Sequence, residues 1–483
     1  MHETRFVHNL FLEIWHLGAT CLFNTAKSFK VISTMAVKTV VLPFVVVIVA
    51  IIASVSLLAP RQRIPDHMIN HTLIEAPNFF TEKEVDDLLQ FTRDMKEILP
   101  LGREYDEYTT LTDNVGEAVP YVKGQPCPRY LIPNGNKTMC VFAGRIDVAR
   151  HFIITGGASA MKERYETLVS RIFAFVRHIP VTEEGMPDLP KRLLTAAKFQ
   201  ELVTGVCPKD KQLVEPIQMT MLAQLPGQTV ATHIDAPYFQ RVSRYHYPVW
   251  LLSVMMWSGL FQKDFIDQVQ IVAYYHKWTD TNRRGRFKFW NNRDSVPAES
   301  SPISGSANAV DGSKVVHAAD VYMPDSLPPR MPDTSTNILR YRKGAKGEHL
   351  WDLVSDEQFI KTFQEDEIRF AMGCRALCFA TKKDIEKYHE DQKNPMPLEQ
   401  IMETFRKDLV KKGLMVEGHE VKMRPYDFAV LLLDTYVKYP MSPTALIPYN
   451  WCVLDRVFKW LTPVVELLCN YDLWMRIERG LGR

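Results

Sequence analysis

Residues of types that bind metal ions occur in two places. His233 and Asp235 are two apart, as on one side of a strand, and His317 lies further along the chain. The first group follows a Pro226-Gly227 turn, and His317 follows an Asp311-Gly312 turn. Residues two apart on a strand project to the same side, so His233 and Asp235 can approach one ion, with His317 as the third ligand from another strand. Two imidazoles and one carboxylate on one face of an octahedron favour Fe(II) in oxygenases. A zinc hydrolase is the chemical competitor, although zinc sites more often use other ligand sets.

Context separates this group from a second His-x-Asp sequence. The chain has 14 histidines, so one match by chance is expected. His389-Glu390-Asp391 lies in the charged stretch KKDIEKYHEDQK, which is typical of a solvated helix face. Taken alone, His317 is more simply a core histidine. Only His233 combines a turn, a strand and a downstream histidine on a strand, which favours the ligand interpretation.

The segment 366–379 (DEIRFAMGCRALCF) alternates between two kinds of residue. On one face we expect Arg369, Ala371, Gly373 and Arg375, and on the other Ile368, Phe370, Met372, Cys374 and Cys378. Small residues between two arginines predict a slot in which a guanidinium grips a carboxylate. An edge strand with arginines facing water is the alternative, chiefly for Arg375.

Strand patterns dominate the segment that must position these residues. PIQMTMLAQL and TVATHID, joined by Pro226-Gly227, predict one hairpin, and residues 306–322, turning at Asp311-Gly312, predict a second. Further strands are expected at 246–259, 268–276, 285–290, 335–342 and 367–380. Many strands without alternating helices predict a sandwich or barrel at 216–380.

Helical patterns flank this segment. Residues 61–215 are expected to form a helical support region, in which Thr81 to Glu84 has the form of a capping box and 159–180 repeats apolar positions at helical spacing. Residues 381–483 are expected to be helical as well, with an apolar-faced segment near 452–470.

The order LPGQTVATHID, DGSKVVHAADVY, EIRFAMGCRA resembles the Fe(II)/2-oxoglutarate-dependent dioxygenases, including their prolyl 4-hydroxylase-like branch. The resemblance covers roughly residues 215–380. It implies an α+β fold with a double-stranded β-helix (jelly roll) core. His233, Asp235 and His317 would be the catalytic iron ligands, and Arg369 would anchor 2-oxoglutarate. Arg369 stands further from His317 than the family's arginine does, so Arg340, Arg342 and Arg375 remain alternatives for the anchor.

The same resemblance implies Fe(II) and 2-oxoglutarate as cofactors, with ascorbate as a further candidate. Oxidative decarboxylation would yield succinate and carbon dioxide while a C–H bond of the substrate is hydroxylated. Protein prolines or lysines, lipids and small molecules all stay open as substrates. Tyr238 and Phe239 could wall the substrate pocket, although core packing is the simpler role for them. A catalytically silent jelly roll that serves as a membrane-tethered binding module is the alternative from another class.

An uncharged, apolar stretch at 39–60 has about the ~20 residues that a helix needs to cross a bilayer. We interpret it as a signal anchor that follows a cytoplasmic segment at 1–38, which makes the membrane itself a partner. The 46% hydrophobic and 24% charged composition suits a globular body after this span. The net charge of +2, without long basic runs, gives no indication of a nucleic-acid partner.

Sequons and cysteines favour a body on the lumenal side. Asn70-His71-Thr72 and Asn136-Lys137-Thr138 both follow the span. Seven of the 8 cysteines also follow it, and Cys127 with Cys140 could close a surface loop around the second sequon. We therefore expect a single-pass type II glycoprotein of the endoplasmic reticulum or Golgi.

Overall fold

The computed structural model describes residues 63–100, 119–122, 131–133, 138–142, 171, 175–181, 185–293, 296–331, 337–418, 423–440 and 459–463. Chain contacts separate residues 1–60 from residues 61–483. The expected membrane span at 39–60 and the segment before it lie outside the described residues. Within the described ranges, no helix is both long and apolar enough to cross a membrane.

Ten antiparallel strands form the large sheet, in the order β1-β14-β11-β19-β7-β6-β2-β16-β17-β18. Four more form a small sheet, in the order β13-β12-β15-β8. The strands of the large sheet are β1 (Leu73–Ala76), β2 (Glu97–Pro100), β6 (Phe175–Ile179), β7 (Leu213–Gln224), β11 (Gln268–Tyr274), β14 (Ala307–Val310), β16 (Asn337–Lys343), β17 (His349–Ser355), β18 (Gln358–Gln364) and β19 (Arg369–Phe379). The strands of the small sheet are β8 (Val230–His233), β12 (Phe287–Trp290), β13 (Ala298–Ser300) and β15 (Val316–Ala319).

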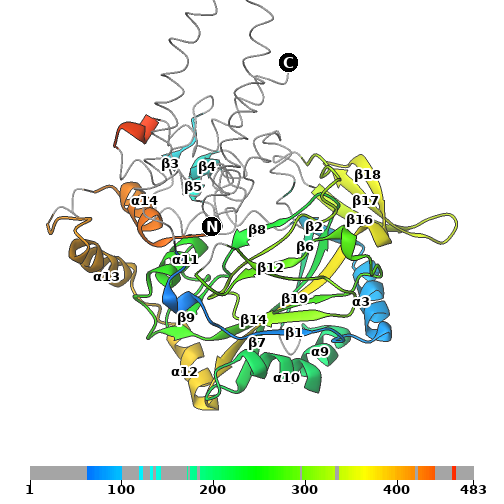
Figure 1. The fold of residues 1–483 in the computed structure, drawn as a ribbon, viewed down its shortest axis with the longest axis horizontal. Coiled ribbons are helices and arrows are strands. Elements are labelled where there is room, and N and C mark those ends of the chain that lie inside the picture. Colours follow the sequence, from blue (N-terminus) through cyan, green and yellow to red (C-terminus); the bar gives the residue numbers. More distant parts are fainter. Residues whose placement is uncertain are drawn as a thin grey trace, which may run out of the picture. The chain divides into compact units, whose positions relative to one another are not determined.

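The chain passes back and forth between the two sheets. It runs from β7 in the large sheet to β8 in the small one, then to β11, to β12 and β13, to β14, to β15 and finally to β19. Eight strands that wind through two facing antiparallel sheets in this way form a jelly roll. The expected β-rich core with flanking helices is therefore confirmed, and Figure 1 shows β8 and β12 lying over β14, β19 and β7.

Both predicted hairpins are wrong, because each turn joins the two sheets. The Pro226-Gly227 turn leads from β7 to β8, and the Asp311-Gly312 turn leads from β14 to β15. Turn residues indicate that the chain reverses, but they do not indicate whether the next strand pairs with the previous one. At Gly227, where φ is 82°, a Cβ would lie 2.5 Å from the backbone nitrogen of Pro328, so the corner requires glycine.

Helices cover the side of the large sheet that faces away from the small sheet (Figure 1). Their apolar residues join those of β7, β11 and β19 in one core. The helices of this layer are α3 (Glu82–Asp94), α9 (Asp188–Thr195) and α10 (Ala197–Val206). The expected capping box is confirmed at Thr81, whose side chain accepts from the Glu84 amide while Glu84 accepts from Thr81. Such reciprocal bonds satisfy two amides at the start of a helix.

The expected helical region at 61–215 is corrected in part. It contributes β1, β2 and β6 to the large sheet, and β6 occupies the end of the segment predicted as helix at 159–180. These strands are four or five residues long, and their existence depends on partners distant in sequence. Small strands at β3 (Val119–Pro120), β4 (Leu131–Pro133) and β5 (Met139–Phe142) form a separate sheet.

The segment predicted as a strand at 246–259 is instead helix α11 (Val249–Ser258). Its residues from Val249 to Trp257 are buried. An apolar run without polar alternation cannot be assigned by periodicity alone, and this one is helical. The remaining strand predictions match β11, β12, β16 and β19.

The described residues between 381 and 440 are mainly helical, as expected. It contains α12 (Lys382–Gln392), α13 (Leu398–Lys411) and α14 (Pro425–Tyr436). Short 3-10 turns occur at η1 (Asp66–Met68), η2 (Thr281–Arg283), η3 (Glu365–Glu367) and η6 (Lys459–Leu461), and a two-stranded ladder pairs β9 (Tyr238–Phe239) with β10 (Phe265–Ile266). Most of the apolar segment at 452–470 lies outside the described residues.

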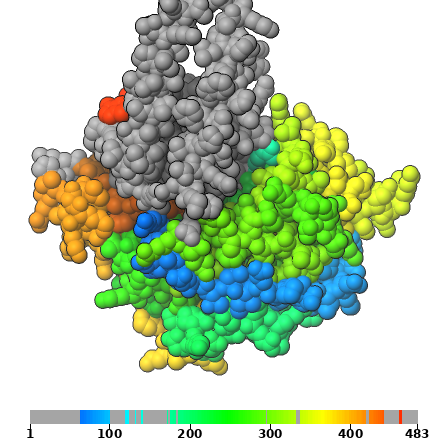
Figure 2. Space-filling model, in the orientation of Figure 1, coloured from blue at the N-terminus to red at the C-terminus, as the bar shows by residue number. Residues whose placement is uncertain are grey.

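Three strands between His317 and Arg369 form an extension of the large sheet. β16, β17 and β18 pair in sequence order, and β16 joins the sheet through β2. In Figure 2 these strands (yellow) stand exposed at one side of the molecule. This extension accounts for the long sequence interval between the two predicted site residues.

Candidate metal centre

Adjacent strands of the small sheet bring the two histidines together. His233 on β8 and His317 on β15 are direct cross-strand partners, and their ring centroids lie 4.3 Å apart. Asp235 follows β8, and all three side chains are buried. One ligand atom from each residue lies within 4.8 Å of the other two, so the three side chains can hold one metal ion.

Hydrogen bonds orient both imidazoles toward this point. Nδ1 of His233 lies 2.7 Å from the Ala231 carbonyl, and Nδ1 of His317 lies 2.9 Å from the Val315 carbonyl. A carbonyl only accepts, so each Nδ1 carries the proton and each Nε2 keeps its lone pair. The two Nε2 atoms lie 3.7 and 3.9 Å from the Asp235 carboxylate oxygens. Fixing the tautomer through the second ring nitrogen is the usual arrangement for metal-binding histidines.

Asp235 is fixed by the large sheet and by a turn. Its backbone N–H donates to the Gly312 carbonyl at 2.8 Å. The Arg375 guanidinium on β19 forms an ion pair with its carboxylate, and the Gln270 amide on β11 donates to it in the orientation that satisfies both groups. Burial alone would raise the pKa of Asp235, but the Arg375 guanidinium outweighs it and holds the pKa far below its usual range. Asp235 is therefore a carboxylate, the form that binds metal.

The face of the large sheet that meets the triad carries polar residues. Along β19 the predicted alternation is confirmed on its apolar side, since Phe370, Met372 and Cys374 belong to the helix-covered core. Arg369 and Arg375 point the other way, toward the small sheet. The polar slot expected between the two arginines is thus on the side of the metal centre.

Arg369 is a buried cation with neutral neighbours. Its Nη1 donates to Gln224 Oε1 at 2.6 Å, and its guanidinium carbon lies 4.8 Å from the centre of the Tyr274 ring. Among the described residues, no carboxylate pairs with Arg369, and neither its Nε nor the buried Tyr274 hydroxyl has a hydrogen-bond partner. Buried polar groups are normally satisfied, so these two donors fit the carboxylate of a bound ligand. Tyr274, the last residue of β11, was not singled out from the sequence.

The other candidate arginines lie on the sheet extension. Arg340 pairs with Glu97 at 2.7 Å and Arg342 pairs with Asp352 at 2.6 Å, and both side chains are partly exposed. His389 lies on α12 as expected and pairs at the surface with Glu215 at 2.7 Å. Tyr238 and Phe239 are buried, and Tyr238 packs in an apolar cluster with Leu377 and Phe379. Arg340, Arg342 and His389 thus pair with carboxylates outside the triad.

The fold and the triad define a jelly-roll protein with a candidate site for one metal ion. No family model and no curated protein sequence matches the chain. Among solved structures, a prolyl-4-hydroxylase from Pseudomonas putida is similar at 9% identity and a TM-score of 0.27, covering 68% of this chain and 98% of that one. A prolyl hydroxylase from Trichoplax adhaerens, in complex with a hypoxia inducible factor peptide fragment, reaches 9% identity and a TM-score of 0.28 over 66% of this chain and 87% of that one.

HygX from Streptomyces hygroscopicus, solved with nickel and 2-oxoglutarate bound, is similar at 8% identity and a TM-score of 0.26. The match covers 63% of this chain and 82% of HygX. HygX has also been solved with iron bound. At TM-scores this low, the function of the chain has to be inferred from its own strand order and side chains.

Proposed function

We propose that this chain is an Fe(II)- and 2-oxoglutarate-dependent oxygenase. The observation that carries the proposal is the convergence of His233, Asp235 and His317 between the two sheets of a jelly roll. Two imidazoles and one carboxylate, with the opposite coordination face left to other ligands, are typical of Fe(II) sites in oxygenases. Zinc sites more commonly use three histidines or several cysteines.

The arginines near the triad have different roles in this proposal. Arg369 and Tyr274 would bind the far carboxylate of 2-oxoglutarate, because they offer two buried donors and one uncompensated charge. Arg375 is already paired with Asp235, so its role is to orient that ligand and keep it ionised. Arg340 and Arg342 have surface carboxylates as partners and are not assigned to the co-substrate.

Bound iron with 2-oxoglutarate and dioxygen would supply the oxidation, giving a hydroxylated substrate, succinate and carbon dioxide. The chain's own part is to hold the coordination geometry and to limit water. Buried side chains on both sheets enclose the triad, which suits a reactive site that must be shielded. Ascorbate would serve only to restore iron that has been oxidised without substrate.

The decisive experiment measures metal content and succinate release for the full chain in detergent micelles, reconstituted with Fe(II) under anaerobic conditions. His233→Ala and His317→Ala should lose both the iron and the conversion of 2-oxoglutarate. His389→Ala is the matched control, since it removes an exposed histidine from the second His-x-Asp sequence, and it should retain both. Wild-type protein that neither binds metal nor consumes 2-oxoglutarate would instead support the silent binding module.

We further propose that the body after residue 61 works in the lumen of the endoplasmic reticulum or Golgi, with 39–60 as the anchor. Cys207 and Cys378 form a disulfide, and Cys140 is also disulfide-bonded, while its expected partner Cys127 lies outside the described residues. Disulfides persist mainly in oxidising compartments. Asn70 of the first sequon is exposed in a turn with φ 59°, and Thr72 is exposed as well, so an oligosaccharide could be attached there.

Glycosidase treatment of protein made in its own secretory pathway tests this location. A mobility shift that is reduced by Asn70→Gln and removed when Asn136→Gln is added would support a lumenal body. Unshifted protein whose engineered surface cysteines label from the cytosolic side would contradict it.

A further inference from the structure

The turn between β14 and β15 touches the metal-binding carboxylate directly. Gly312 accepts the backbone hydrogen bond of Asp235 at 2.8 Å. A Cβ placed on Gly312 would collide with Asp235 Oδ2 and lie 2.9 Å from the end of the Gln270 amide. The backbone of this turn is therefore one wall of the site that holds Asp235.

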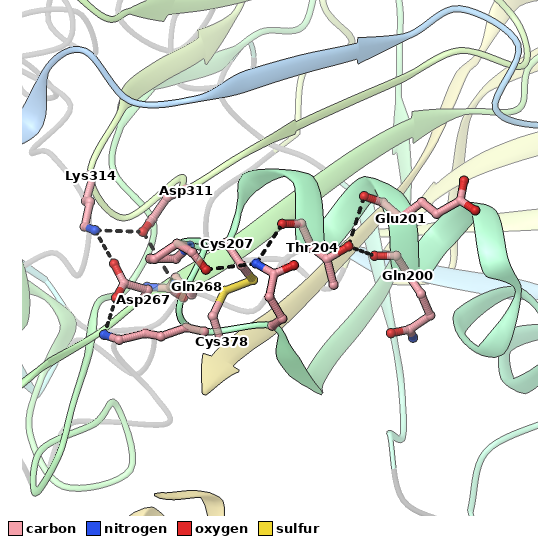
Figure 3. The surroundings of a disulfide bond; sticks show 12 residues. Gln200, Glu201, Thr204, Cys207, Asp267, Gln268, Asp311, Lys314 and Cys378 are labelled. Carbon is pink, nitrogen blue, oxygen red and sulfur yellow. Dashed lines mark hydrogen bonds and ion pairs between the residues drawn. A yellow bond between two sulfur atoms is a disulfide. The ribbon is translucent and has the colours of Figure 1, made fainter. Parts of the chain in front are cut away.

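Four alternating charges fix that turn, and we call them the charge cluster: Lys211, Asp267, Asp311 and Lys314. Lys314 forms an ion pair with Asp267 Oδ1 and lies 3.6 Å from Asp311 Oδ2, while Lys211 lies 2.6 Å from Asp267 Oδ2. Asp311 also accepts from the backbone and hydroxyl of Ser313, at 3.1 and 2.6 Å. Figure 3 shows Lys314 between Asp311 and Asp267.

Most of the charge cluster is shielded from water. The side chains of Asp311 and Asp267 are 8% and 12% exposed, and that of Lys314 is 15% exposed. Burial raises the pKa of Asp311, whereas Lys314 and Lys211 outweigh burial at Asp267 and hold its pKa below the usual range. Desolvation offsets the attraction within buried ion pairs of this kind, so their net contribution to stability is small.

The Cys207–Cys378 disulfide fixes the cluster from the other side. The Cys378 N–H donates to the Asp267 carbonyl at 2.8 Å. Cys207 ends α10 and begins the turn that presents Lys211, whose N–H donates to the Pro208 carbonyl at 2.8 Å. Figure 3 shows the disulfide next to Asp267 and Gln268. One cross-link thus holds both the backbone of Asp267 and the chain that carries its lysine partner.

We propose that the charge cluster is a positioning device for Asp235, and that the Cys207–Cys378 disulfide sustains it, so that the metal affinity of the triad depends on this disulfide. The inference rests on the proposed metal site. Lys314 and Lys211 act on Asp235 only through Asp267, Asp311 and the Gly312 backbone, so they are positioning residues. Substitutions in groups that orient metal ligands typically weaken metal binding by about 10- to 100-fold.

The test is a titration of the full chain in detergent micelles with Co(II), whose visible absorption reports ligand geometry as well as binding. Lys314→Met should raise the Co(II) Kd by about 10- to 100-fold and alter the visible spectrum, while circular dichroism remains that of the folded wild type. Lys393→Met removes an exposed lysine at the end of α12 and is the matched control, with an unchanged Kd. Weaker folding alone would lower the melting temperature without changing the spectrum of the cobalt-bound protein.

A second pair of variants tests the role of the disulfide. Cys207→Ala with Cys378→Ala should weaken Co(II) binding, and Lys211→Met should then add less than about twofold, because both changes release the same turn. If the cysteine variant does not fold, the Lys211→Met and Lys314→Met titrations still decide whether the charge cluster positions Asp235.

Wild-type protein that binds Co(II) through its histidines, together with lysine variants of equal affinity, would overturn this inference and leave the proposed function standing. Wild-type protein without any Co(II) binding would overturn the proposed function, and this inference with it.

Discussion

The two faces of strand β19 differ sharply although they share one backbone. Phe370, Met372 and Cys374 enter a core shared with α3, α9 and α10. Arg369 and Arg375 lie on the face toward the small sheet. Arg369 contacts Gln224 and Tyr274 on other strands of the large sheet, and Arg375 contacts Asp235. The first face buries apolar surface and stabilises the fold, whereas the second buries two charged side chains. Substitutions on the two faces should therefore affect different measurements.

The largest effect should come from the apolar face. Phe370 is fully buried between Tyr275 and Trp351, at ring distances of 5.6 and 5.7 Å. Phe370→Ala should lower the free energy of unfolding by about 3–5 kcal/mol, because it leaves a cavity in a packed core. Urea unfolding measures the loss, and the protein that remains folded should bind Co(II) as wild type does. A changed Co(II) Kd in folded protein would break the separation of the two faces.

Gly312→Ala should have the next largest effect, and on the site alone. Its methyl group would collide with the Asp235 carboxylate, so the Co(II) Kd should rise by up to about 100-fold, or about 2.7 kcal/mol. Gly347→Ala is the control for a glycine replacement that strains the backbone away from the site: its φ is 91°, nothing lies within 4 Å of the added methyl group, and the Co(II) Kd should be unchanged. Unchanged affinity in Gly312→Ala would show that the turn does not wall the site.

Arg369→Gln tests the polar face at the end away from Asp235. Removing a charged donor to a carboxylate costs about 1.5–3 kcal/mol, so the KM for 2-oxoglutarate should rise by about 10- to 100-fold. The Co(II) Kd should be unchanged, since Arg369 does not contact the triad. Arg340→Gln, which removes a partly exposed arginine paired with Glu97, should leave KM at the wild-type value. An equal rise in both variants would remove Arg369 from its assigned role.

An effect of pH, smaller when counted per pH unit, should arise next to Arg369. Burial and the charge of Arg369 lower the pKa of His276 to about 3, while an unfolded histidine has a pKa of about 6.5. Below pH ~6.5 the unfolded chain takes up a proton that the folded chain does not, so stability should fall as pH is lowered toward 3. The contribution is at most about 1.4 kcal/mol per pH unit. Urea unfolding between pH 4 and 6 should show a shallower slope for His276→Gln than for wild type.

The smallest effect concerns Cys374 on the apolar face. Burial raises the pKa of its thiol well above the usual range, and the side chain is enclosed by the core. Iodoacetamide at pH 8 should leave Cys374 unmodified in folded protein and alkylate it in urea, as peptide mass spectrometry would show. Rapid alkylation of the folded chain would indicate that the helix layer opens readily.

Local patterns in the sequence predicted the strand that separates these faces and the residues of the triad. Eleven residues of period-two alternation specify β19, and the spacing of His233 and Asp235 specifies one side of a strand. Pairing was not predictable in the same way. The corners at Gly227 and Gly312 were read as hairpin turns, because a turn sequence does not state which sheet receives the next strand.

Contacts between distant segments account for the remaining differences. α11 is apolar on all sides, so its period gave no sign of a helix, and β1, β2 and β6 are too short to be recognised without their partners. The charge cluster joins residues from three separate segments, and the disulfide spans a sequence separation of 171. Neither is visible until the fold brings the segments together.

The hairpin between β16 and β17 is a suitable site for inserting a tag. Its tip at 345–348 is exposed, and the polar side chains that occupy it make no contribution to the metal centre. Exposed loop tips tolerate insertions best, so a short epitope or a dye-bearing peptide placed after Lys346 should leave the jelly roll intact. The extension that lengthened the interval between His317 and Arg369 would then serve as an attachment point for imaging or immobilising the protein.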